Sequence, residues 1–122
     1  MSRTLPFLLL AIAAPALARD HADPLAGYVA GAARECLDNS QTLGPDVIDD
    51  RTILYRENGR RIWRNDLPER CPGLRPYVTL IVIDKFGGQL CRNDRFRFVE
   101  PPQTIPGAVC RFGNFTPYTK AK

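Results

Sequence analysis

The chain has 122 residues, 44% of them hydrophobic and 25% charged, and its 17 basic and 13 acidic residues give a net charge of +4. This length suits one domain rather than two. Because the basic residues are scattered among acidic ones, the weak positive charge predicts no nucleic-acid partner.

The chain opens with the pattern of a cleavable export signal over residues 1–18. Arg3 precedes a mostly apolar stretch over residues 5–17, and Ala16-Leu17-Ala18 is a small-x-small cleavage site. The apolar stretch is shorter than the roughly 20 residues that span a membrane. We therefore expect cleavage near Ala18 and a periplasmic or secreted protein with no membrane span.

A chain cleaved after Ala18 begins Arg19-Asp20-His21. A free α-amino group, two backbone amides and the imidazole of His21 form a nitrogen-rich square plane, which suits Cu(II) or Ni(II). His21 is therefore a candidate metal ligand. Histidine also falls at the third position of exported chains by chance, so an uninvolved side chain is the alternative. We expect no other cofactor.

Residues 19–35 are interpreted as a lead-in segment with a short helix. Asp23-Pro24 suits a helix start, and the apolar residues that follow recur at helical spacing. Gly27 and Gly31 disfavour a helix, so a mobile lead-in is the alternative.

The clearest strand signal is a hairpin. Thr52–Glu57 and Arg60–Asn65 are separated by Asn58-Gly59, which suits a type I′ turn with positive φ at Gly59. This turn fixes the register of the two strands and thereby decides which side chains share a face.

In that register Leu54 lies opposite Trp63, and Arg56 and Arg61 share the face of Trp63. A surface of arginine and aromatic side chains suits an anionic or sugar-bearing ligand. Arg56, Arg61 and Trp63 are therefore the candidate binding residues. In the alternative interpretation, arginine stems cover the sheet while their heads pair with acids such as Glu57.

The unbroken apolar run Tyr77–Ile83 is rich in β-branched residues. It predicts a strand that is buried on both faces at the centre of the sheet. Arg75-Pro76 before the run and Asp84-Lys85 after it are the residues expected to guard it against aggregation.

These segments predict a mainly β fold with a short N-terminal helical segment and two disulfides. Residues 36–117 form a small antiparallel sheet or a partly open barrel of about five to seven strands. A flexible tail follows over residues 118–122. Alternation over Arg95–Val99 predicts one further strand, after which a Pro-rich loop covers residues 101–106.

The four cysteines suit an exported domain with two disulfides. Their spacing is too wide for a zinc site, and three connectivities are open. We favour Cys36–Cys71 with Cys91–Cys110. The nested arrangement, Cys36–Cys110 with Cys71–Cys91, is the alternative.

No constellation of residues predicts catalysis. Nucleophilic catalysis needs a base beside the nucleophile, and the predicted domain from Cys36 onward contains no histidine. Asp49 and Asp50 are adjacent, so on a strand their carboxylates point to opposite faces. We therefore name no catalytic residue and expect a protein that is not an enzyme.

The element Arg70-Cys71-Pro72-Gly73-Leu74, with Asp49–Leu54 before it and Cys110–Phe115 after it, resembles a family of small exported bacterial proteins catalogued as a domain of unknown function. The similarity covers about residues 36–117. It implies an envelope or secreted location and four structural cysteines, and it brings no known activity.

We therefore expect a monomeric, non-enzymatic, periplasmic or secreted β domain that binds a protein or an envelope component through one face of its hairpin. An inhibitor of a secreted enzyme is the rival interpretation, because small disulfide-linked scaffolds present rigid loops, here Pro101–Pro106. Metal binding at Arg19-Asp20-His21 is the third.

Overall fold

The computed structural model describes residues 4, 6, 23–84 and 87–121. Apart from residues 4 and 6, the export signal expected over residues 1–18 lies outside the described residues, as do Arg19-Asp20-His21 and the metal site expected there. Within the described residues the fold is mainly β, and every pair of neighbouring strands is antiparallel.

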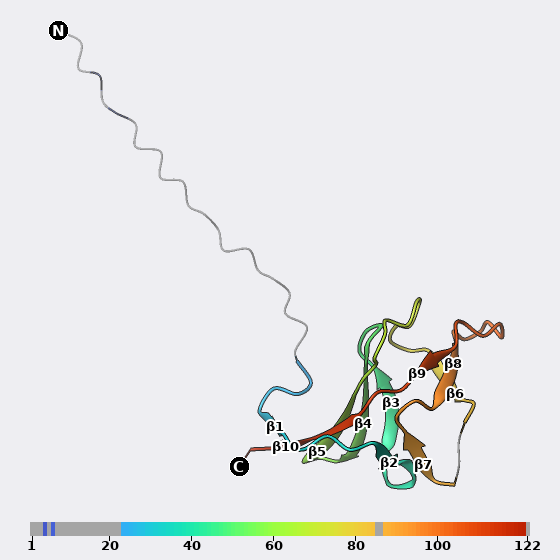
Figure 1. The fold of residues 1–122 in the computed structure, drawn as a ribbon. Coiled ribbons are helices and arrows are strands. Elements are labelled where there is room, and N and C mark those ends of the chain that lie inside the picture. Colours follow the sequence, from blue (N-terminus) through green and yellow to red (C-terminus); the bar gives the residue numbers. More distant parts are fainter. Residues whose placement is uncertain (1–3, 5, 7–22, 85–86, 122) are drawn as a thin grey trace.

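The main sheet has the strand order β1-β10-β5-β4-β3. Its strands are β1 (Tyr28–Ala30), β3 (Leu43–Val47), β4 (Thr52–Asn58), β5 (Arg61–Asp66) and β10 (Phe115–Lys120). β10 lies between β1 and β5, so the end of the chain returns to the hairpin (Figure 1). The flexible tail expected from residue 118 is wrong up to Lys120, because Tyr118 pairs with both Ala30 and Ile62.

Two smaller sheets complete the fold. β2 (Cys36–Asp38) pairs with β7 (Gln89–Cys91), and a short 3-10 helix, Asn39–Gln41, follows β2. The other sheet has the order β6-β8-β9, with β6 (Thr79–Val82), β8 (Arg95–Val99) and β9 (Cys110–Arg111). The expected antiparallel β fold is confirmed. The single sheet or barrel of five to seven strands is wrong, because the described residues form ten strands in three sheets. Within these residues β6, β8 and β9 pair among themselves and leave the main sheet separate.

The lead-in segment forms no helix where it is described. Residues 24–27 make a turn in which Gly27 has φ +82°, and β1 follows directly. A left-handed glycine ends a helical path. Residues 28–30 of the lead-in instead belong to the main sheet, because β1 pairs with β10 over its whole length.

The hairpin forms as expected, but its register differs by one residue. Tyr55 lies opposite Trp63, and Leu54 lies opposite Arg64. The expected pairing of Leu54 with Trp63 is therefore wrong. Tyr55 and Trp63 face the main core, whereas Leu54 belongs to the cluster on the other face of the main sheet.

The reason for the shift is the turn. The side chain of Asn58 accepts hydrogen bonds from the backbone N–H groups of Arg60 at 2.8 Å and of Arg61 at 3.0 Å. Gly59 does not adopt a positive φ, so the turn is not type I′. Asn58 pairs with Arg61, so the turn starts the pairing two positions away from the expected register. The β-bulge between Arg56 and Asn58 reduces this offset to one position for every later pair.

The core lies between the main sheet and the two smaller ones. Its aromatic centre runs from Phe96 through Phe112 to Phe115, with ring centroids 4.6 and 6.0 Å apart. A second cluster, Leu25, Leu54 and Ile62, lies on the outer face of the main sheet. Both faces of the main sheet are therefore covered by apolar side chains.

The apolar run Tyr77–Ile83 is a strand only at β6, and β6 is an edge strand. Its expected central, doubly buried position is wrong. Tyr77 has φ +71°, which interrupts the extended chain, and its side chain is 96% exposed. Ile81 on the outer face is 44% exposed, whereas Leu80 packs against the core.

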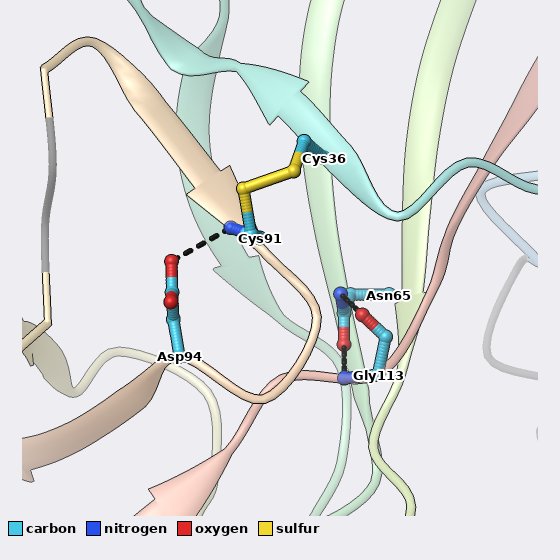
Figure 2. Close-up of a disulfide and its surroundings, with 5 residues drawn as sticks. All are labelled: Cys36, Asn65, Cys91, Asp94 and Gly113. Carbon is cyan, nitrogen blue, oxygen red and sulfur yellow. Dashed lines mark hydrogen bonds between the residues drawn. A yellow bond between two sulfur atoms is a disulfide. The ribbon is translucent and has the colours of Figure 1, made fainter.

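Both disulfides form, but neither expected pairing is correct. The bonds are Cys36–Cys91 and Cys71–Cys110. β2 pairs with β7 so that Cys36 lies directly opposite Cys91, with Cα atoms 4.0 Å apart (Figure 2). The favoured pairing assumed that each bridge closes one local segment. It failed because β2 pairs with a strand far along the chain.

Candidate binding cleft

An open cleft of about 770 Å³ lies beside the outer face of the main sheet. Three segments line it, namely the start of the lead-in at Asp23, the strands β3 and β4, and residues 76–78 before β6. The cleft therefore forms only when segments from distant parts of the sequence come together.

The cleft carries more negative than positive charge. Its charged lining residues are Asp23, Asp46 and Arg56. Nε of Arg56 lies 3.3 Å from Oδ2 of Asp46, and each side chain is about half exposed. Oδ1 of Asp23 accepts a hydrogen bond from the backbone N–H of Leu25 at 3.0 Å. With one carboxylate in excess, the cleft suits a ligand with a cationic group.

The apolar part of the lining combines aliphatic side chains with three prolines. Ile48, Leu54 and Val78 line the cleft together with Pro24, Pro45 and Pro76. Leu54 is only 1% exposed and belongs to the outer cluster, so its position is fixed by packing. Because a preformed surface loses little conformational entropy on binding, this lining suits an extended apolar segment.

Tyr77 stands at the same cleft with its side chain almost fully in solvent. A bulky residue with positive φ is an outlier, and such residues cluster at functional sites. Tyrosine combines apolar area with a hydroxyl group, and it is enriched where proteins contact one another. The apolar run of the sequence predicted Tyr77 inside a buried strand, so its exposed position was not expected. The preceding Pro76 was the available signal that the strand starts later.

The three candidate binding residues do not share one face. Arg56 lines the cleft, whereas Trp63 faces the core and is 5% exposed. Nε1 of Trp63 donates to Glu57 at 3.0 Å, and the guanidinium groups of Arg34 and Arg61 lie 5.5 and 5.9 Å from the centre of its ring. The one-residue shift of the hairpin register separates Arg56 from the other two.

The pair Arg61 and Trp63 fits the alternative interpretation, in which arginine covers the sheet. Nη1 of Arg61 lies 3.6 Å from Oε2 of Glu57, the acid that also accepts the hydrogen bond of the indole. Arg34 completes this arrangement from the segment before β2, which no local pattern in the sequence could indicate. A small pocket of about 150 Å³ remains there.

The Pro-rich loop 101–106 joins β8 to β9 and is exposed. Ile105 is 82% exposed. The backbone N–H of Gly107 donates to the carbonyl of Phe98 at 2.7 Å, and an ion pair between Arg75 and Glu100 joins the base of the loop to the segment before β6. These two contacts hold the base of the loop in place. The loop lies on the side of the molecule opposite β1 (Figure 1).

The carboxylates with a clear pKa shift are structural in character. Hydrogen bonds from Ser40 hold the pKa of Asp38 below its ordinary value, and hydrogen bonds from Arg95 do the same for Asp84. A general acid needs a raised pKa instead. Among the described residues, no group of three or more His, Cys, Asp or Glu side chains is placed to hold a metal ion.

Comparisons with protein-family models, with curated proteins and with solved structures found no match to this chain. The resemblance to a family of small exported proteins therefore stays a prediction. No helix in residues 23–84 or 87–121 is long and apolar enough to cross a membrane.

Proposed function

We propose that the protein is an exported, non-enzymatic β domain whose cleft binds an extended segment of a partner protein. The observation that carries the proposal is the combination, in one cleft, of an apolar lining, an excess carboxylate and the exposed ring of Tyr77. The two disulfides fit an oxidising compartment, as does the export signal expected over residues 1–18.

The chemistry of the cleft specifies the segment. Its volume lies within the range of about 300–1,000 Å³ that is typical of ligand sites. Pro45, Ile48 and Leu54 offer contacts for an aliphatic side chain, and the carboxylates of Asp23 and Asp46 offer partners for a lysine or arginine. We therefore expect an apolar residue next to a basic one in the bound segment.

Inhibition of a secreted enzyme is the second candidate function. Its support is Ile105, which is 82% exposed on a loop whose base is held by the Arg75–Glu100 pair. A rigid loop with an exposed aliphatic side chain suits the substrate groove of a hydrolase, because such a loop pays little conformational entropy on binding.

Site-specific photocrosslinking separates the two candidates. A photoreactive amino acid replaces Ile48 in the cleft, Ile105 on the loop, or Leu43, which is 75% exposed and lies outside the cleft. In cells that produce the protein, we expect covalent adducts from position 48 only. Adducts from position 105 alone would favour the inhibitor, and equal yields at all three positions would contradict both.

Peptide arrays then test the proposed chemistry. The purified protein should select peptides in which an aliphatic residue adjoins lysine or arginine, and Tyr77→Ser should weaken binding about tenfold or more. Asp46→Asn should remove the preference for the basic residue while the apolar preference remains. Leu43→Ser is the matched control. Binding that is unchanged by Tyr77→Ser would overturn the assignment of the cleft.

A further inference from the structure

The strand β6 has a hydrogen-bonding partner on one side only. Among the described residues it pairs with β8 alone. The N–H of Ile83 donates to the carbonyl of Arg95 at 2.8 Å, and residues that bond to the neighbouring strand alternate along an antiparallel pair. Ile81 therefore also faces β8 with its backbone groups, while Leu80 and Val82 direct their N–H and C=O groups away from it.

Two of the three charged residues expected to guard this edge are engaged elsewhere, and the third, Lys85, lies outside the described residues. Arg75 pairs with Glu100, which follows β8. The carboxylate of Asp84 accepts three hydrogen bonds from Arg95, at 2.8, 3.0 and 3.1 Å, and these bonds hold its pKa low. Both side chains are thus bound on the β8 side. Residues 78–83 themselves carry no charge, so no side chain of this segment repels a second strand electrostatically.

We propose that β6 pairs with β6 of a second copy of this chain, antiparallel, about a twofold axis at Ile81. In this register Leu80 of each copy lies opposite Val82 of the other. These are the residues whose backbone groups point outward, so each pair exchanges two hydrogen bonds. The two β6-β8-β9 sheets then become one continuous sheet.

The side chains support the same register. On the outer face, Ile81 lies opposite Ile81, and Thr79 lies opposite Ile83. Ile81 and Ile83 are 44% and 43% exposed in the single chain. Cross-strand pairs of β-branched residues stabilise a sheet. The strand is therefore complementary to itself in both hydrogen bonding and side-chain contacts.

A second copy fits this edge better than an endless stack of chains. Tyr77, with φ +71°, leaves the extended conformation just before the strand, so the pairing has a defined end. A twofold contact uses the β6 edge of both chains at once, so it closes after two copies. The dimer goes beyond the proposed function, because the hydrogen-bonding edge at Leu80 and Val82 is not part of the cleft lining.

Sedimentation equilibrium over roughly 1–100 μM tests the proposal. We expect a concentration-dependent dimer of the disulfide-bonded protein. Ile81→Lys and Ile81→Glu should each raise the dissociation constant about tenfold or more, because the twofold axis places like charges directly opposite each other. Val109→Lys is the matched control, since Val109 is 45% exposed and lies outside β6. It should dimerise like the parent.

Mixing the two Ile81 variants distinguishes pairing from misfolding. An equimolar mixture of Ile81→Lys and Ile81→Glu places opposite charges across the axis and should restore the dimer. A mixture that stays monomeric while both variants melt like the parent would overturn the register. A parent chain that stays monomeric over the whole concentration range would overturn the dimer. The β6 edge would then be available to a strand of another protein.

Discussion

Asn65 joins two distant parts of the chain through its side chain. It is fully buried on β5, where its Nδ2 donates to the carbonyl of Gly113 at 2.8 Å and its Oδ1 accepts from the N–H of Gly113 at 2.9 Å (Figure 2). A buried polar group without partners costs about 1–3 kcal/mol. The amide therefore fixes where the chain must pass before it enters β10.

Gly113 cannot be replaced without moving the backbone. A Cβ atom there would lie 1.9 Å from the carbonyl oxygen of Asp66, whereas a Cβ atom at Gly59 would meet nothing within 4 Å. We expect Gly113→Ala to lower the free energy of unfolding by about 2 kcal/mol or more. Gly59→Ala should change it by less than about 0.5 kcal/mol.

Urea denaturation of the two glycine variants checks this difference. The result also decides how the hairpin turn is built. A type I′ turn needs positive φ at Gly59, so a large loss of stability in Gly59→Ala would contradict the turn in which Asn58 accepts from Arg60 and Arg61.

At the scale of single elements, β1 shows how the lead-in contributes to stability. Leu25 is 8% exposed and packs with Leu54 and Ile62, whereas Val29 on β1 is 61% exposed. We expect Leu25→Ala to cost about 2–3 kcal/mol, from lost burial and the cavity that it leaves. Val29→Ala should be nearly neutral. Thermal melting of both variants checks this, and equal melting temperatures would contradict a packed lead-in.

The sequence predicted elements well where the signal is local. The hairpin strands and the strand at Arg95–Val99 lie where alternation and turn residues placed them. The expected register was wrong because Asn58 pairs with Arg61 instead of lying in the turn, where its side chain accepts a hydrogen bond from Arg60. The central position predicted for Tyr77–Ile83 was wrong, because an apolar composition does not indicate how many neighbouring strands a strand has.

At the scale of the whole molecule, the pairing of distant segments lay beyond the sequence. Nothing local indicates that β2 pairs with β7 or that β10 lies between β1 and β5. The cleft depends on such pairings, because Asp23, Arg56 and Tyr77 meet only in the complete fold. For this reason Arg56 was found as a candidate residue, while the cleft that contains it was not.

The two disulfides should open in a defined order. Cys36 and Cys91 are half-buried, whereas Cys71 is 0% and Cys110 is 9% exposed. Reduction requires a thiolate to reach a sulfur atom. Mild dithiothreitol followed by alkylation and peptide mass spectrometry should therefore modify Cys36 and Cys91 first. Early modification of Cys71 and Cys110 would contradict the burial of the second bridge.

Two variants, each with both cysteines of one disulfide replaced by serine, test whether a bridge stabilises the fold through its buried position or through the entropy of the unfolded chain. The bridges close segments with sequence separations of 55 and 39 residues, and this difference alone is worth only about 0.3 kcal/mol. Removing Cys36–Cys91 should cost about 2–4 kcal/mol and leave a cooperative fold. Removing Cys71–Cys110 should cost more, because two hydroxyl groups then replace sulfur in the core. Equal losses of unfolding free energy in urea denaturation would mean that both bridges act only by restricting the unfolded chain.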